Sequence, residues 1–225
     1  MESAVPIYDI TPFTALDYPE HLAAILWFAG CNMRCPYCYN PDIVLGKGKM
    51  SEKEALAFLK SRRGLIDGVV LSGGEATLYQ ALPALCEKIK ALGFKLKLDT
   101  NGSQPQMLYR LIESGLLDYV ALDYKAPKEK FQKVTRNKHF DDFAMSLQIL
   151  IQGDVAYEVR TTVCRELLEE EDINRIIVDL YRRGYRGKYY LQPYIEDTPH
   201  LGRMKKKGEL FDRSKLISKL EVIWR

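Results

Sequence analysis

Strand-like and helix-like segments alternate along most of the chain, and this alternation restricts its fold more than any other feature. Apolar runs alternate with segments of helical period from residue 22 to about residue 193. The predicted strands are 22–29, 68–72, 94–100, 118–124, 155–163 and 188–192. The predicted helices are about 52–62, 78–92, 104–114, 139–151 and 170–183. Six βα units form a parallel sheet but are too few for a closed eight-stranded barrel, so we expect a partial (β/α)₆ barrel of the TIM type.

Length and composition agree with a single α/β domain. A chain of 225 residues fits one domain, for which we expect a core barrel at about 20–195 and a C-terminal extension at about 196–225. The chain is 47% hydrophobic and 28% charged, and no apolar run approaches the ~18 residues that a membrane span needs. The first ten residues do not resemble an export signal, so we expect a cytoplasmic protein. A net charge of +3 is too small to indicate nucleic-acid binding.

Polar side chains occupy one face of three consecutive predicted strands. In 94–101, 118–125 and 155–163, apolar positions alternate with charged ones. A parallel sheet buried on both faces should have nearly continuous apolar strands, so the polar face either lines a cavity or contacts solvent. Acids and bases recur at the strands' C-terminal ends, where barrel enzymes place their chemistry, and this favours a cavity. The polar faces carry Lys97, Asp99, Asn101, Asp123, Lys125, Glu158 and Arg160.

Three cysteines follow the first predicted strand in the segment GCNMRCPYCYN. Cys31, Cys35 and Cys38 have the spacing C-x3-C-x2-C, and none of the three histidines lies nearby. A structural zinc site and a ferredoxin-type cluster both use four protein ligands. Three thiolates on a 4Fe–4S cluster leave one iron open for a substrate, whereas a zinc site would need a distant histidine. The remaining cysteines, Cys86 and Cys164, lie in apolar stretches and are predicted to be buried.

These motifs resemble the radical S-adenosylmethionine (SAM) superfamily. Its hallmark is CxxxCxxC with an aromatic residue, here Tyr37, before the last cysteine. The second predicted strand ends in SGGE (72–75), which matches the superfamily's GGE element. The resemblance continues through DTNG (99–102), DYK (123–125), Arg160 and QPY (192–194), and covers about residues 7–194.

Within the superfamily, the chain is most similar to the activases of glycyl radical enzymes, above all the anaerobic ribonucleoside-triphosphate reductase activating proteins. The supporting segments are 14–32, 67–75, 96–103 and 116–127. Pyruvate formate-lyase activases share the same motifs. The chain departs from the usual pattern at Tyr39, where histidine is common, and at Ala76, where proline is common. It also has Ile195 where pyruvate formate-lyase activases have a histidine.

The resemblance implies a 4Fe–4S cluster and SAM as cofactors, with a role for each matching residue. Cys31, Cys35 and Cys38 would ligate the cluster and so carry the catalysis. SAM would be held by Tyr37 near the adenine, by Gly73, Gly74 and Glu75 at the amino group, by Lys125 and Arg160 at the carboxylate or ribose, and by Asn101 and Gln192. Asp99 and Asp123 match aspartates that bind a monovalent cation in pyruvate formate-lyase activases. The repulsion between these two carboxylates could equally be relieved by pairing with Lys97 and Lys125.

The implied activity is reductive cleavage of SAM, followed by formation of a glycyl radical on a partner enzyme under anaerobic conditions. The predicted partners are anaerobic ribonucleotide reductase and a flavodoxin- or ferredoxin-type electron donor. A pyruvate formate-lyase-type activase, a radical SAM enzyme with a small-molecule substrate and a non-enzymatic Fe–S carrier remain alternatives. We further expect the barrel to open sideways between its first and last strands. The segment after residue 193, with Arg203 and Lys205 to Lys207, would then form part of a docking face or be a mobile tail.

Overall fold

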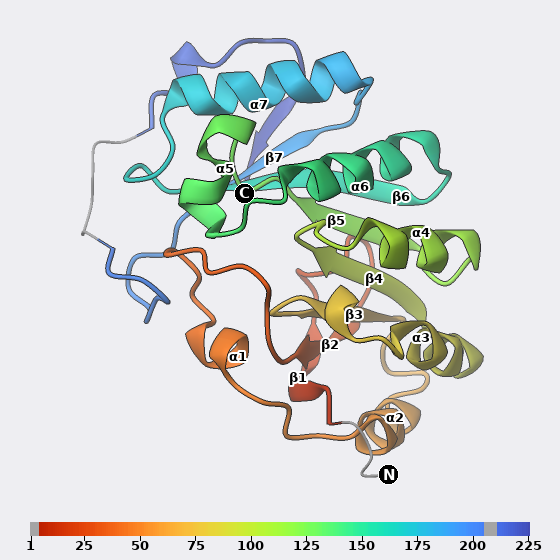
Figure 1. Ribbon diagram of the computed structural model, residues 1–225. Helices are drawn as coiled ribbons and strands as arrows, with labels where there is room; N and C mark the ends of the chain where they lie inside the picture. Colours follow the sequence, from red (N-terminus) through yellow and green to blue (C-terminus); the bar gives the residue numbers. More distant parts are fainter. Residues whose placement is uncertain (1–4, 205–210) are drawn as a thin grey trace.

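The computed structural model describes residues 5–204 and 211–225 and contains an open sheet of eight strands in sequence order (Figure 1). The first strand, β1 (Ile7–Thr14), runs antiparallel to β2, and all later neighbours are parallel. The other strands are β2 (Ala23–Phe28), β3 (Gly68–Gly73), β4 (Lys95–Thr100), β5 (Tyr119–Asp123), β6 (Ala156–Val163), β7 (Tyr189–Pro193) and β8 (Val222–Trp224). The six predicted strands and the partial barrel are confirmed.

The two edge strands of the sheet, β1 with eight residues and β8 with three, were not predicted from the sequence. The strand β1 contains Pro12, which cannot donate a ladder hydrogen bond and is tolerated because β1 is an edge strand. The strand β8 has only three residues, and it pairs with the first three residues of β7. In the described part of the chain β1 and β8 do not pair with each other, so the barrel stays open between them. The gap between β1 and β8 is therefore narrower than the gap that a sheet of only six strands would leave.

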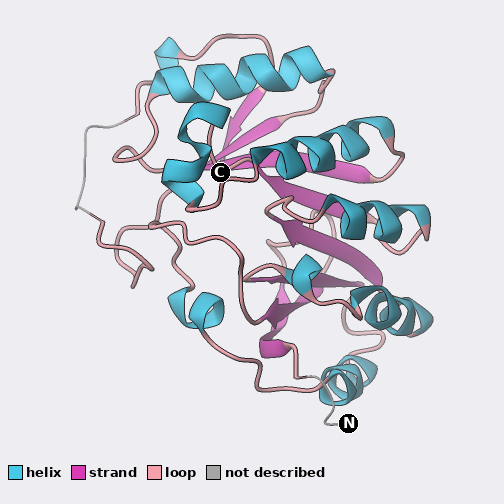
Figure 2. Ribbon diagram, viewed as in Figure 1, coloured by secondary structure: helices cyan, strands magenta, loops and turns pink. Residues whose placement is uncertain are grey.

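Helices cover the outer face of the sheet (Figure 2). The predicted helices correspond to α2 (Glu52–Ser61), α3 (Leu82–Ala91), α4 (Pro105–Glu113), α6 (Phe140–Gln152) and α7 (Glu170–Arg183). The helix α3 begins four residues later than predicted because Pro83 occupies its first turn. The sequence analysis missed α1 (Pro41–Leu45), α5 (Lys128–Thr135) and the 3₁₀ turns η1 (Ala76–Leu78) and η2 (Arg213–Lys215). Within the described residues, no helix has the length and apolar character that a membrane span requires.

The two faces of the strands differ as the alternating pattern predicts. On the outer face, Leu26, Leu71, Leu98 and Leu122 are fully buried in the core that the sheet shares with the helices. The inner face has a smaller apolar cluster, formed by Tyr18, Ala23, Ile25 and Val70, near the N-terminal ends of the strands. Charged and polar side chains follow toward the C-terminal ends. The fold therefore places a polar chamber at the carboxyl edge of the parallel strands.

Candidate functional site

A cavity of about 200 Å³ lies at the C-terminal ends of the strands, beside the cysteine loop. Its wall combines side chains from that loop with residues from the ends of β3, β4, β5, β6 and β7. The predicted site residues on this wall are Cys31, Cys35, Tyr37, Cys38, Gly73, Gly74, Asp99, Asn101, Asp123, Lys125, Arg160 and Gln192. Glu75 is the one predicted site residue that does not line the cavity among the described residues. The structure thus collects residues that are far apart in the sequence around one space.

The three loop cysteines are free thiols that face this cavity. Burial raises the pKa of Cys31 to about 12 and that of Cys35 to about 11. Both groups are therefore neutral thiols at pH 7 unless a bound metal removes their protons. The loop is compact, because the Cys38 amide donates to the Cys35 carbonyl at 3.0 Å and the Met33 amide approaches the Cys31 sulfur at 3.4 Å.

Side chains from the neighbouring strand end hold the cysteine loop in place. The Asn32 amide nitrogen donates to the Ser103 hydroxyl at 2.8 Å, and Asn101 Nδ2 donates to Asn32 Oδ1 at 3.1 Å. Asn101 Nδ2 also lies 3.7 Å from the Cys31 sulfur. Asn32 and Ser103 were not predicted as site residues. A polar residue inside CxxxCxxC is the only signal that could have indicated Asn32.

The glycine pair is required because the cysteine loop and the end of β3 pack backbone against backbone. A Cβ on Gly74 would lie 1.8 Å from the Gly30 carbonyl oxygen, and a Cβ on Gly73 would lie 2.5 Å from the Phe28 amide nitrogen. Gly73 also has a φ of +119°, which disfavours any side chain. The sequence analysis assigned these glycines to close approach of a ligand. The structure adds a second reason, the close approach of the loop itself.

Glu75 is buried behind the cavity wall, where four protein donors surround its carboxylate. Oε1 accepts hydrogen bonds from the Thr77 amide, the Thr77 hydroxyl and the Thr100 hydroxyl, at 3.2, 2.5 and 2.8 Å. Oε2 accepts from the Asn101 amide at 2.7 Å. Burial raises the pKa of Glu75, against the opposing effect of these donors. In this structure Glu75 joins the ends of β3 and β4, and its predicted contact with the SAM amino group stays a prediction.

Asp99 and Asp123 both point inward and are bridged by Arg160. Arg160 donates to Asp123 at 2.6 Å and lies 3.3 Å from Asp99. Lys97 pairs with Asp99 at 2.5 Å, and Lys125 pairs with Asp123 at 2.9 Å. Burial alone would raise the pKa of both aspartates, but the neighbouring cations outweigh it and hold both pKa values below their usual range.

These ion pairs explain how the two aspartates can lie close together without strong repulsion. The sequence analysis left a bound cation and pairing with Lys97 and Lys125 open, and the structure has the lysine pairs plus Arg160. Among the described residues, no three His, Cys, Asp or Glu side chains converge as ligands of one metal ion. The monovalent cation at Asp99 and Asp123 therefore stays a prediction. Asp99, Asp123, Lys125 and Arg160 line the cavity together with Asp17, whereas Lys97 is buried and does not line it.

The segment that follows β7 packs against the cysteine loop. The Leu201 amide donates to the Cys38 carbonyl, and the Gly202 amide donates to the Pro36 carbonyl, both at 2.9 Å. A Cβ on Gly202 would lie 2.7 Å from the Pro36 side chain, so glycine is needed for this approach. We expected this segment to be part of a docking face or a mobile tail, and its contact with the loop was not predicted. Lys205 to Lys207, which were part of that prediction, lie outside the described residues.

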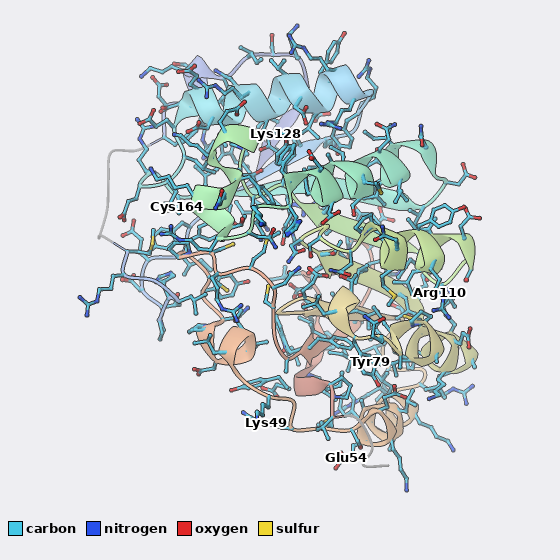
Figure 3. The ribbon with its side chains drawn as sticks, viewed as in Figure 1. Lys49, Glu54, Tyr79, Arg110, Lys128 and Cys164 are labelled. Atoms are coloured by element: carbon cyan, nitrogen blue, oxygen red, sulfur yellow. The ribbon has the colours of Figure 1, made fainter. Side chains whose placement is uncertain are left out.

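The two isolated cysteines are buried away from the cavity, as predicted. Cys86 lies in α3 and is fully buried, and Cys164 follows the end of β6 (Figure 3). Neither lines the cavity. The chamber thus brings together three of the chain's five cysteines.

An incomplete barrel with three cysteines in one loop and polar strand ends defines a recognisable class. A model of the radical SAM superfamily matches residues 25–177. The chain belongs to this superfamily.

Sequence relatives identify the family of this chain within the superfamily. A protein of Methanocaldococcus jannaschii described as "Putative glycyl-radical enzyme activating enzyme" is 33% identical over 177 residues, which are 74% of this chain and 72% of the relative. The chain belongs to the family of these activating enzymes. The pyruvate formate-lyase-activating enzyme of Streptococcus mutans is 38% identical over 97 residues, 39% of this chain and 36% of that protein. The 7-carboxy-7-deazaguanine synthase of Aquifex aeolicus is 22% identical over 176 residues, 68% of this chain and 80% of that protein.

Solved structures show the same fold. SuiB of Streptococcus suis, in a crystal structure with S-adenosylmethionine bound, superimposes with a TM-score of 0.64 at 15% sequence identity. The match covers 87% of this chain and 48% of SuiB, so the chain spans about half the length of that enzyme. At this identity the likeness supports the radical SAM fold.

Proposed function

We propose that this protein is a radical SAM activase that generates a glycyl radical on a partner enzyme, anaerobic ribonucleoside-triphosphate reductase. One observation carries the proposal. Three free thiols and the ion-paired side chains of Asp99, Asp123, Lys125 and Arg160 line the same cavity at the carboxyl ends of a parallel sheet. The thiols suit an iron–sulfur cluster, and the paired charges suit a cofactor that carries both an ammonium and a carboxylate group.

The residues of the loop fit a 4Fe–4S cluster with one open iron. Cys31, Cys35 and Cys38 would hold it, since soft thiolates are the preferred ligands of iron–sulfur clusters. When bound and reduced, such a cluster supplies the electron that cleaves SAM to methionine and a 5′-deoxyadenosyl radical. Cys86 and Cys164 are buried elsewhere and do not line the cavity, so no fourth cysteine of the chain faces the three thiols.

The chain's other residues bind and orient SAM in this proposal. Lys125 has a single carboxylate partner and faces the cavity, so its remaining N–H groups can donate to the SAM carboxylate. The buried Tyr37 hydroxyl lies beside the Cys35 thiol and has no nitrogen or oxygen partner among the described residues, which suits a polar group of the adenosine part. Asn101 and Gln192 offer amide groups on the same wall. Leu201 and Tyr37 would restrict the entry of water from the side of the loop.

The partner assignment depends on sequence resemblance and on the relatives' names. Ile195, which is 50% exposed, stands where pyruvate formate-lyase activases have a histidine, and this argues against a pyruvate formate-lyase-type target. The departures at Tyr39 and Ala76 are from the common pattern of the family and do not distinguish the two targets. The electron donor would be a flavodoxin- or ferredoxin-type protein. The similarity to 7-carboxy-7-deazaguanine synthase favours a second candidate, a radical SAM enzyme with a small-molecule substrate. That enzyme would need no partner protein for turnover.

The decisive experiment is anaerobic reconstitution with iron and sulfide, followed by dithionite, SAM and anaerobic ribonucleotide reductase. We expect a doublet glycyl radical signal by electron paramagnetic resonance, with no signal from the Cys38→Ala control. A signal on pyruvate formate-lyase alone would reassign the partner. SAM cleavage with no signal on either enzyme would remove the activase proposal and favour a small-molecule substrate.

A further inference from the structure

Exposed basic side chains surround the outer side of the cysteine loop. The group consists of Arg34, Lys133, Arg136, Lys138 and Arg203, and we call it the basic rim. All five side chains are exposed, and none lines the cavity. The ion pairs of the described residues include none of these five side chains, in contrast to Lys128 and Lys130 of the same helix, although Glu129 lies in the same hollow as Lys133 and Arg136. The rim is therefore a predominantly positive surface.

Backbone hydrogen bonds fix the rim against the cysteines. The Arg34 amide donates to the Thr135 carbonyl at 2.8 Å, which joins the loop to the end of α5. The Arg34 guanidinium donates to the Cys31 carbonyl at 2.6 Å. On the other side, Arg203 directly follows Gly202, whose amide bonds to Pro36. A protein bound to the rim would therefore lie against the backbone of the loop that carries the thiols.

Arg136 occupies a backbone conformation that favours glycine. It ends α5 with a φ of 58°, and it is one of two described non-glycine residues with positive φ. Glycine is the usual residue at such a helix end because a side chain there is strained. The Arg136 side chain is exposed and lines a surface hollow with Glu129, Gln132 and Lys133, where two cations face one carboxylate. An exposed arginine at this position suits recognition of an acidic surface.

We propose that the basic rim docks the protein that reduces the cluster, a small acidic one-electron carrier. This inference rests on the proposed function, because it needs a cluster at Cys31, Cys35 and Cys38. One electron would pass from the reduced carrier to the cluster, with no bond or proton transferred. The target glycine must enter the cavity, whose wall excludes the rim, but an electron donor needs only a close approach to the loop.

The test compares two triple variants of the reconstituted protein, with a flavodoxin as the probe. The rim variant is K133Q/R136Q/K138Q. Its control, K53Q/K60Q/R63Q, removes the same number of exposed positive charges on and just after α2, at the other end of the molecule from α5 (Figure 1). At low salt we expect the rim variant to bind oxidised flavodoxin about tenfold more weakly and to be reduced by photoreduced flavodoxin about tenfold more slowly. The control should match the wild type, and added salt should narrow the difference.

Reduction and SAM cleavage with dithionite should be equal in all three proteins, because dithionite does not need the rim. Equal flavodoxin affinity in the rim variant would overturn the proposal. So would a rim variant that takes electrons normally from flavodoxin but activates the glycyl radical partner slowly, since the rim would then bind the target enzyme. Flavodoxin affinity, cluster reduction and SAM cleavage need no glycyl radical, so the activase proposal can fail without affecting these three measurements.

A single substitution separates docking from folding. Arg136→Gly removes one charge of the rim and also relieves the left-handed backbone, so Tm should stay unchanged or rise by up to about 2 °C. Flavodoxin affinity should nevertheless fall about twofold to threefold at low salt. A lower Tm, or an unchanged affinity, would contradict the role given to Arg136.

Discussion

The inner face of the barrel has two regions that differ in how their charged side chains are paired. The floor, near the N-terminal ends of the strands, holds Glu158, which is 2% exposed and accepts two hydrogen bonds from Arg225 at 2.9 and 2.8 Å. Toward the carboxyl ends, Asp99 and Asp123 share three cations: Arg160 contacts both carboxylates, and Lys97 and Lys125 contact one each. The floor has one arginine paired with one carboxylate, whereas Lys125, Arg160 and both aspartates of the upper chamber also face the cavity.

This difference separates stability from ligand binding. A buried carboxylate with a bidentate arginine has no capacity left for another charged group, so the floor serves the fold. In the chamber, Lys125 and Arg160 are paired but also face the cavity, so their remaining N–H groups can bind a ligand. The substitutions below test whether the two regions differ in this way.

The largest expected effect comes from the thiols at the top of the chamber. Replacing Cys31, Cys35 or Cys38 by alanine should each abolish the 4Fe–4S absorbance and SAM cleavage, because the cluster has no spare protein ligand. Cys86→Ala and Cys164→Ala should retain both properties. Iron and sulfide content, with 5′-deoxyadenosine measured by chromatography, gives the result. A cluster that needs either buried cysteine would contradict the open-iron assignment.

Arg160 should be the most important charge in the chamber. Arg160→Met leaves Asp99 and Asp123 buried with one fewer cation, so we expect the free energy of unfolding to fall by about 3–5 kcal/mol. Urea denaturation of the unloaded protein measures this loss. The matched Arg182→Met substitution, at an exposed position in α7, should change it by no more than about 0.5 kcal/mol. Equal losses in both variants would mean that the chamber network does not support the fold.

The sequence predicts the chamber well because its signals are local. Alternation within 94–101 and 118–125 correctly placed Asp99 and Asp123 on the inner face, and the cysteine spacing gave the loop. The sequence failed where long-range backbone contacts decide the structure. The strand β8 forms because three residues far along the chain pair with β7, and Leu201 reaches Cys38 through a backbone amide. Such contacts leave no periodicity in the sequence.

Glu75 shares one feature with each region. Its carboxylate accepts four hydrogen bonds from the protein, as a floor residue would, but it lies next to the cavity wall. Glu75→Gln keeps the shape but turns one accepting oxygen into a donor facing N–H or O–H groups. We expect the free energy of unfolding to fall by about 1–3 kcal/mol and the cluster to survive. If Glu75 also pairs with the SAM ammonium group, SAM affinity should weaken by ~1.5–3 kcal/mol. Calorimetry measures both, with the exposed Glu113→Gln as the control.

An unchanged SAM dissociation constant with reduced stability would assign Glu75 to the fold alone. The carboxylate would then act as the link between β3 and β4 that the four hydrogen bonds describe. Unchanged stability together with weaker SAM binding would instead show that the ligand draws the carboxylate away from these donors.

The smallest expected effect is at Arg225, which lies on the floor of the open barrel. Its guanidinium pairs with Glu158 and lies 3.6 Å from the centre of the Tyr190 ring, but its side chain is 38% exposed. Water can therefore partly replace the lost interaction, and Arg225→Gln should lower the free energy of unfolding by only about 1 kcal/mol. SAM affinity should not change, because neither Arg225 nor Glu158 lines the cavity. The control Lys188→Gln breaks an exposed pair with Glu221 and should cost less than about 0.5 kcal/mol. A variant that folds normally but binds SAM more weakly would show that the floor and the chamber are coupled through Arg160 on the same face of β6.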